Sequence, residues 1–305
     1  MLLNTLDKTK KTVVALGKFD GVHIGHKKLI ECAADTARKK GLLSLIYVIC
    51  PADSDRIMKE KDKIEIIKNY GADIYYRENV TTDFMSMSAV EFVTEILKKK
   101  LNCVHVIAGY NFRFAKNRSA DAKELKRLCC ENKMECSIIG KVTCVGSDGA
   151  EHKVSSSRIC SLIEKGDVSE AAKYLGRPYF LSGTVICGRQ IGRSLDFPTA
   201  NITYGGLKPI LKSGVYVTNT YISGKKYPSV TNVGTNPTVS SDGNISVETN
   251  IIDFCENIYG KDIRVEFIKK IRGEIKFASV GELKCQIAKD KQSAETYFKE
   301  LSENS

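Results

Sequence analysis

The 305-residue sequence has no tryptophan, no CxxC pair and no long uninterrupted apolar run. Without such a run we expect no membrane span, and the first residues, MLLNTLDKTKK, lack the apolar core of a secretory signal. Eleven cysteines are present, most of them in apolar surroundings such as LIYVIC and ELKCQI. We therefore expect a cytoplasmic protein with reduced core thiols, rather than a secreted protein held by disulfides.

Only 36 acidic residues accompany 47 lysines and arginines, so the formal net charge is +11. A basic protein attracts polyanions, which include nucleic acids and small nucleotides such as ATP. The lysines are spread along the chain rather than gathered into one arm. We therefore expect no nucleic-acid partner, although a basic RNA- or DNA-binding module remains the alternative from a different functional class.

The first half of the chain alternates strand and helix patterns. Continuous apolar runs such as TVVALG (12–17) and CVHVIAGY (103–110) are separated by amphipathic helical segments such as 26–41 and 119–132. Buried strands that alternate with helices indicate a parallel sheet covered on both faces. The sequence therefore predicts a doubly wound, Rossmann-like α/β domain.

After residue 180 the pattern changes to short β-rich segments bounded by Gly, Pro, Asn and Asp, followed by a terminal helical pattern. Such spacing is typical of a small antiparallel barrel. Just before it, Asp167 and Glu170 form a capping-box pattern at the start of a predicted helix. We expect two domains, 1–178 and 179–305; the sequence does not fix the oligomeric state.

Two of the four histidines lie three residues apart in GKFDGVHIGH, residues 17–26. The predicted strand ends at Gly17 and a helix begins at about His23 to His26. Ligands of parallel sheets bind at the carboxyl ends of the strands, where helix N-termini attract phosphate. Gly21 and Gly25 allow the backbone to approach a phosphate closely, and both histidines can donate hydrogen bonds to it.

Two other interpretations of the histidine pair remain. A zinc site needs a third and fourth ligand, and no nearby cluster of cysteine and histidine supplies them. Two structural histidines without a chemical role are the second alternative.

The histidine segment resembles the G-x-F-D-G-x-H-x-G-H signature of nucleotidyltransferases, in the form found in bacterial bifunctional riboflavin kinase/FMN adenylyltransferases, also called FAD synthetases. Two further segments are similar to motifs of that family: VIAGYNFRFAKNRSAD to its flavin-side segment, and VSSSRIC to a segment that contacts ATP phosphates. The resemblance implies catalytic roles for His23 and His26, an ATP site formed by Gly17, Phe19, Asp20, Gly21, Gly25, Ser155, Ser156, Ser157 and Arg158, and a flavin site formed by Asn111, Phe112, Arg113 and Arg118.

In the second half, GRQIGRSLDFPTANI resembles the riboflavin kinase motif that ends in P-T-A-N. Thr199 and Asn201 alternate on an extended segment, so that a hydroxyl and an amide oxygen face one side. Hard oxygen ligands of this kind suit Mg²⁺. The stretch alone also fits a polar turn before a strand, but TNVGTNPTV and VETNIIDF follow in the order of the family.

Glu248 lies in an alternating strand, with its neighbours Val247 and Thr249 on the other face. By resemblance it is the base that takes the proton of the ribityl 5′-hydroxyl as this attacks the γ-phosphate of ATP; the alternative is a surface glutamate. The resemblance further implies Mg²⁺ ligands at Thr199 and Asn201, an ATP site in the kinase formed by Gly188, Arg193, Pro198, Thr199, Asn232 and Gly234, and flavin contacts from Arg272 and Glu274.

Taken together, the resemblance implies a nucleotidyltransferase domain that makes FAD from FMN and ATP, followed by a barrel that makes FMN from riboflavin and MgATP. Several positions depart from the family pattern; in the first half, Cys160 replaces an arginine, and Ala115 and Ala120 replace glycines. These departures motivate an alternative, a riboflavin kinase whose N-terminal domain is impaired in adenylyl transfer.

Overall fold

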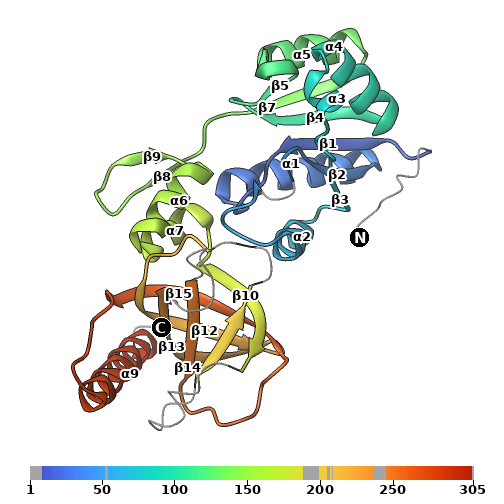
Figure 1. Ribbon diagram of the computed structural model, residues 1–305. Coiled ribbons are helices and arrows are strands. Elements are labelled where there is room, and N and C mark those ends of the chain that lie inside the picture. Colours follow the sequence, from blue (N-terminus) through green and yellow to red (C-terminus); the bar gives the residue numbers. More distant parts are fainter. Residues whose placement is uncertain are drawn as a thin grey trace. The chain divides into compact units, whose positions relative to one another are not determined.

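The computed structural model describes residues 9–51, 54–187, 199–204, 207, 209–235 and 245–303. The chain falls into two compact units, which are described separately (Figure 1). Unit 1 comprises residues 1–55 and 60–156, and unit 2 comprises residues 56–59 and 157–305.

Unit 1 is built on a five-stranded parallel sheet with the order β3-β2-β1-β4-β7. The strands are β1 (Thr12–Gly17), β2 (Leu43–Val48), β3 (Ile74–Arg77), β4 (Cys103–Gly109) and β7 (Glu135–Ile139). From β1 the chain builds outward through β2 and β3 and then returns to the other side of β1 with β4. The predicted parallel sheet is confirmed, and its order reverses between β1 and β4.

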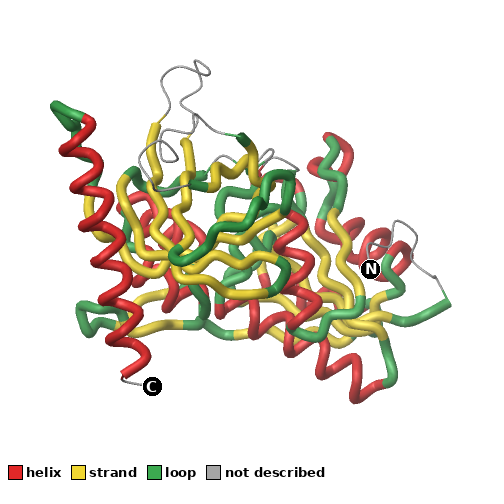
Figure 2. The backbone as a smooth tube through the Cα atoms, turned by 90° about the horizontal axis from the view of Figure 1, so that it is seen from below, coloured by secondary structure: helices red, strands yellow, loops and turns green. Residues whose placement is uncertain are grey.

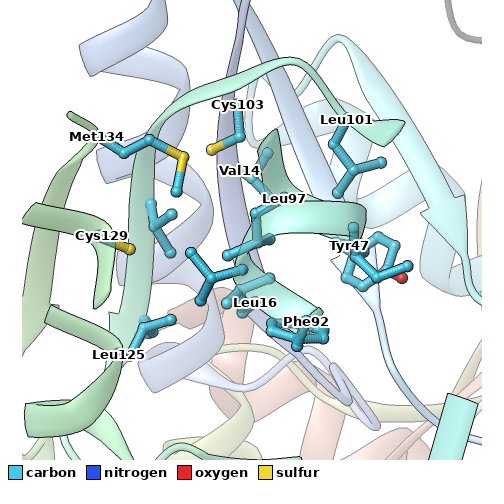
Figure 3. Close-up of a cluster of buried hydrophobic side chains, with 14 of the residues drawn as sticks. Val14, Leu16, Tyr47, Phe92, Leu97, Leu101, Cys103, Leu125, Cys129 and Met134 are labelled. Atoms are coloured by element: carbon cyan, nitrogen blue, oxygen red, sulfur yellow. The ribbon is translucent and has the colours of Figure 1, made fainter. Parts of the chain in front are cut away.

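Helices cover both faces of this sheet. They are α1 (Ile24–Lys40), α2 (Glu60–Asn69), α3 (Thr82–Ser86), α4 (Ala89–Glu91), the π-helical segment η2 (Phe92–Lys100) and α5 (Ala122–Glu131). Figure 3 shows Val14 and Leu16 of β1 packed with Phe92 and Leu97 of η2 and with Leu125 of α5. Since alternate residues of a strand face opposite ways, Val13 and Ala15, also fully buried, face the side of α1.

Several short elements surround the carboxyl end of the sheet. They are β5 (Arg113–Phe114), the 3₁₀ turn η3 (Lys116–Arg118), β6 (Ala120–Asp121), β8 (Thr143–Val145) and β9 (Glu151–Lys153). Strands β8 and β9 pair as an antiparallel hairpin. The sequence patterns did not predict this hairpin, because its strands are only three residues long and half-exposed.

Unit 2 contains a closed barrel with the order β10-β11-β14-β13-β12-β15. Its elements are α6 (Ser156–Lys165, entered from unit 1 at Ser156), α7 (Val168–Leu175), β10 (Tyr179–Ile186), β11 (Ala200–Thr203), β12 (Gly214–Ile222), β13 (Lys225–Thr235), β14 (Ile245–Ile251), β15 (Asp262–Arg272) and α9 (Val280–Glu303). The predicted barrel and terminal helix are confirmed. The expected division at residues 178/179 stays a prediction; by packing, most of α6 and all of α7 lie with the barrel.

The capping box expected at residue 167 does not form. Asp167 precedes α7, but its side chain makes no capping hydrogen bond; only its backbone carbonyl accepts one from Ala171. Its ψ of 58° lies outside the extended region that a side-chain cap normally requires. The helix instead ends as the pattern predicts, at Gly176 in the left-handed conformation.

The barrel has a partly polar interior. The hydroxyls of Thr218, Ser229, Thr231 and Thr249 are fully buried and hydrogen-bond to one another across three strands at 2.8–2.9 Å. On the outer face, α9 packs against β12 and β13 through apolar residues such as Val215 and Ala294, and Figure 2 shows it as one long helix along the strands. The pairing of the hydroxyls fixes the alignment of neighbouring strands, because an unpaired buried hydroxyl is costly.

Candidate active sites

The loop between β1 and α1 is tightly wound. Phe19, Gly21 and Val22 all have positive φ angles, of 53°, 76° and 37°. For a β-branched residue such as Val22 this is a strained conformation, and it persists because the side chains of Phe19 and Val22 are completely buried. Buried apolar anchors therefore hold the turn that brings the start of α1 to the end of β1.

The two histidines of this segment form a stacked pair at the start of α1. His23 is the N-cap: its Nδ1 accepts a hydrogen bond from the backbone N–H of His26 at 3.2 Å. The two rings are nearly parallel, with centroids 3.6 Å apart. Because Nδ1 accepts, the proton of neutral His23 resides on Nε2, which makes Nε2 a hydrogen-bond donor.

Gly25 is required by this stacking. A Cβ atom at position 25 would lie 3.2 Å from both Cε1 and Nδ1 of His23, closer than carbon atoms normally pack. A Cβ at Gly17 would meet the ring of Phe19 at 3.0 Å. Both glycines thus make room for the rings that shape the loop.

A cavity of about 780 Å³ lies at the carboxyl end of the sheet. It is bordered by the ends of β1 and β4, where the strand order reverses, which is where open α/β sheets bind their ligands. The volume suits a nucleotide-sized ligand. The predicted residues that line it are Gly17, His23, Gly25, His26, Asn111, Phe112, Arg113, Arg118, Ser155 and Ser156.

The cavity is electrostatically suited to a polyanion. Four cationic side chains line it, Lys18, Arg113, Arg118 and Lys153, and among the described lining residues there is no aspartate or glutamate. The N-terminus of α1 adds a partial positive charge. No acidic residue lies in the first turn of that helix to offset it.

One wall of the cavity is aromatic and apolar. Phe112 and Phe114 stack with centroids 5.7 Å apart, and Phe92 lies 5.1 Å from Phe114. Phe84 and Met87 extend the same wall. The sequence gave no sign of these last two, since they come from α3 and the segment after it, about 60 residues from the histidine motif.

Ala115, in the segment predicted to bind flavin, has a strained backbone. Its φ of 67° and ψ of 177° fall in a region that is essentially restricted to glycine. The glycine of the family pattern at this position therefore has a conformational reason. Ala120, the second departure from glycine, has an ordinary φ and is buried.

Five residues predicted for the ATP site do not line the cavity. Phe19, Asp20 and Gly21 shape the loop behind it; the backbone carbonyl of Asp20 accepts a hydrogen bond from Ser156 Oγ at 3.0 Å. Ser157 and Arg158 belong to unit 2, where the guanidinium of Arg158 lies over the ring of Tyr174 at 5.1 Å.

The second candidate site lies on the outer face of the barrel. Asn201 of β11 is directly opposite Glu248 of β14, and Glu248 is directly opposite Asn232 of β13. Residues opposite each other in antiparallel strands have their side chains on the same face, about 5 Å apart. The alternation expected from the sequence is present, since Val247 and Thr249 point into the barrel and Glu248 does not.

Gly234 and Glu274 extend this face. A Cβ at Gly234 would lie 3.1 Å from Oε1 of Glu274 and 3.4 Å from Oγ of Ser246. The glycine therefore leaves space that the Glu274 carboxylate uses. Asn201, Glu248, Asn232, Gly234 and Glu274, predicted from four separate segments, thus gather on one face.

Arg272 continues the same row of residues but is engaged with α9. Its Nε and one terminal nitrogen donate to the carboxylate of Asp290 at 3.0 and 2.7 Å, and Gln286 donates to the same carboxylate. The Asp290 side chain is only 5% exposed. The arginine is therefore held in a fixed orientation by the terminal helix.

The remaining predicted kinase residues are only partly described. Thr199 is half-buried and directly precedes β11. Gly188, Arg193 and Pro198 lie outside the described residues.

Comparison with known proteins separates the same two parts. A family model for FAD synthetase matches residues 5–158, and one for riboflavin kinase matches residues 175–298. A bifunctional riboflavin kinase/FMN adenylyltransferase of Bacillus subtilis (strain 168) is 34% identical, over 97% of this chain and 95% of that protein. The chain belongs to this bifunctional family.

Other members of the bifunctional family match at similar length. The Listeria monocytogenes protein is 34% identical over 95% of this chain and 94% of its own. A solved structure from Streptococcus pneumoniae, described as a macrolide-efflux protein, has a TM-score of 0.81 and 31% identity over 94% of both chains. Among the helices of the described residues, none is long and apolar enough to cross a membrane.

Proposed function

We propose that this chain phosphorylates riboflavin to FMN on the barrel of unit 2 and transfers AMP from ATP to FMN in the cavity of unit 1, giving FAD and pyrophosphate. The observation that supports the second activity most is the cavity itself, which is lined by a stacked histidine pair at a helix N-terminus and by four cations, with no carboxylate among its described lining residues. Family membership supports both activities.

In adenylyl transfer, a phosphate oxygen of FMN attacks the α-phosphorus of ATP, and the bond from that phosphorus to the bridging oxygen breaks as pyrophosphate leaves. No proton has to be removed from the nucleophile, so positioning and charge stabilisation carry the step. His23 Nε2, His26 and the N–H groups at the start of α1 stabilise the charge that develops on the α-phosphate.

The flavin is bound on the aromatic side of the same cavity. Phe112 and Phe114 supply a flat apolar surface for the isoalloxazine ring, and Asn111 and Arg118 line the cavity beside it. Arg113, at the start of β5, offers a planar fork for the FMN phosphate. ATP and FMN thus meet at the end of β1.

In phosphoryl transfer, Glu248 accepts the proton of the ribityl 5′-hydroxyl. The hydroxyl oxygen attacks the γ-phosphorus of ATP, and ADP leaves. Asn232 and Gly234 border ADP, and Glu274 faces the flavin. Glu248 lies between Asn201 and Asn232 of the two neighbouring strands and is the carboxylate among these three paired residues. This placement supports its role as the base.

The residues of this face fit Mg²⁺. Thr199 and Asn201 supply the hydroxyl and amide oxygens that would hold the ion, and Glu248 lies directly across from Asn201. No group of three His, Cys, Asp or Glu side chains suited to a metal occurs among the described residues, in keeping with an ion held mainly by phosphates and water. When bound, Mg²⁺ offsets the charge of the ATP phosphates and aligns them for transfer.

We further propose that the chain works in the cytoplasm. All eleven cysteines are free thiols, and several are fully buried. Free thiols in this number are typical of a reducing compartment.

The test is to incubate the protein with riboflavin, ATP and Mg²⁺ and to separate riboflavin, FMN and FAD by chromatography. FMN followed by FAD supports both activities. FMN that accumulates without FAD identifies the alternative, a kinase with an impaired N-terminal unit. Absence of both products contradicts the proposal.

Two variants assign the activities to their sites. Glu248→Gln is expected to lower FMN formation by at least about 100-fold while FAD formation from added FMN is unchanged. His23→Asn keeps an oxygen that can cap α1 but removes the Nε2 donor, so we expect FAD formation to fall about 100-fold with FMN formation intact. The exposed Glu256→Gln is the control for the barrel.

A further inference from the structure

The adenylyl-transfer cavity needs a cation for the ATP triphosphate, which carries about four negative charges. The family pattern has an arginine at position 160, where this chain has a buried cysteine. Of the four cations that line the cavity, Arg113 and Arg118 belong to the segment that we assign to flavin binding. This leaves Lys18 and Lys153 for the phosphates.

Lys153 lies where the β8–β9 hairpin meets the start of α1. The backbone N–H of the next residue, Val154, bonds to the carbonyl of Val142 at 3.0 Å. The Cβ of Val142 is 3.8 Å from the position of a Cβ at Gly25, between the two histidines. The base of the hairpin thus lies beside Gly25, the residue between the two histidines in the first turn of α1, and Lys153 is one residue from that base.

The ammonium group of Lys153 lies over an aromatic ring. It lies 5.2 Å from the centre of the Tyr110 ring, and Tyr110 is fixed at the end of β4 by its backbone hydrogen bond to Ile139. A cation–π contact orients the charge but does not neutralise it, whereas a carboxylate partner would neutralise it. For Lys18, the other candidate, the described residues show a contact of its backbone carbonyl with the Cys50 thiol and no aromatic ring beneath its ammonium group.

We propose that Lys153 binds the triphosphate of ATP during adenylyl transfer and stabilises the negative charge of the departing pyrophosphate. It thereby supplies a positive charge in a chain that has a cysteine at position 160, where the family pattern has an arginine. The inference rests on the proposed assignment of adenylyl transfer to this cavity, and it concerns a residue that neither the sequence patterns nor the family resemblance singled out.

The test compares Lys153→Gln with Lys153→Arg in the full-length protein, with FMN and ATP as substrates. We expect the glutamine variant to lose about 10- to 100-fold in kcat/KM for ATP, the usual effect of losing a hydrogen bond to a charged group, while the KM for FMN stays within about twofold. Inhibition by added pyrophosphate weakens in parallel. The arginine variant, which keeps the charge, retains most of the rate.

Two comparisons make the result specific. Lys141→Gln removes a lysine near the same hairpin that does not line the cavity, and we expect no change in FAD formation. Urea unfolding of each variant reports whether unit 1, which carries Lys153 and Lys141, is folded, and FMN formation from riboflavin reports on unit 2.

The outcomes separate this inference from the function on which it rests. If His23→Asn abolishes FAD formation but Lys153→Gln leaves it unchanged, the role of Lys153 is refuted and the assignment of adenylyl transfer to the cavity is retained. The same holds if Lys18→Gln lowers FAD formation and Lys153→Gln does not. If neither the histidine nor the lysine variant changes FAD formation, the assignment of adenylyl transfer to this cavity fails. Equal losses in the glutamine and arginine variants of Lys153 would show that its charge is not what matters.

Discussion

The side chain of His23 accepts a hydrogen bond from the backbone of His26, and the two imidazole rings stack 3.6 Å apart. His23 thereby caps α1 and has a defined tautomer when neutral, and the ring of His26 stacks on the ring of His23. The local order of this loop is what aims hydrogen-bond donors at the cavity.

Gly25→Ala is expected to disturb this order. The added methyl would lie 3.2 Å from the His23 ring and push it aside, and small displacements of reacting groups cost about 10- to 100-fold in rate. FAD formation from FMN should fall by that amount, whereas FMN formation should not change. Gly140→Ala is the control, because it also lines the cavity but has nothing within 4 Å of the added methyl.

Ala115→Gly is expected to stabilise unit 1. Ala115 occupies a backbone region nearly exclusive to glycine, where other residues lose about 1–3 kcal/mol. After subtracting the entropy that glycine loses on folding, we expect a net gain of about 1 kcal/mol in the free energy of unfolding, measured by denaturant titration.

The matched comparison for that variant is Ala120→Gly, at the other position where the family pattern has glycine. Ala120 has an ordinary backbone conformation and a buried methyl group, so its replacement should lower stability by about 1 kcal/mol. Changes of the same sign in both variants would contradict the interpretation that strain at Ala115 is the deciding factor.

Asp290→Asn is expected to weaken both the packing of α9 and the kinase. Removing one charge of the nearly buried Arg272–Asp290 pair leaves a guanidinium without its counterion, at a cost of about 3 kcal/mol in the stability of unit 2. FMN formation should drop with it, while FAD formation from added FMN should persist. Asp253→Asn, which breaks an exposed pair with Lys291 of the same helix, should cost less than about 1 kcal/mol.

The stability of unit 1 should depend on pH through His105. Burial lowers the pKa of His105, the nearby Lys40 ammonium lowers it too, and Glu135 opposes both. A histidine with a lowered pKa takes up its proton more readily in the unfolded chain. Stability is therefore full above about pH 6.5, the pKa of an unfolded histidine, and is lost as the pH falls below that value.

The measurement is urea unfolding of unit 1 between pH 5 and 8. In His105→Gln, which keeps a hydrogen-bonding partner for Ser137, the free energy of unfolding should fall less between pH 6.5 and pH 5 than in the unmodified chain. In the control His152→Gln, on the β8–β9 hairpin, the decrease in the free energy of unfolding at low pH should be the same as in the unmodified chain. An undiminished slope in the His105 variant would mean that another group causes the acid sensitivity.

The sequence by itself determined the elements and the local parts of both sites. The apolar runs predicted the parallel strands, and GKFDGVHIGH predicted a turn from the first strand into a helix that begins at about His23 to His26. The alternation of residues 247–249 likewise placed Glu248 outside the barrel. In each case the property depends on neighbours within a few positions.

Only the tertiary structure decided which distant residues meet. The pairing of β11, β13 and β14 aligned Asn201, Glu248 and Asn232, and packing against α9 turned Arg272 toward Asp290. The hairpin that carries Lys153, and Phe84 of α3 in the aromatic wall, came to the cavity in the same way. Strand register and helix packing arise from contacts between segments far apart in the chain, so no local pattern encodes them.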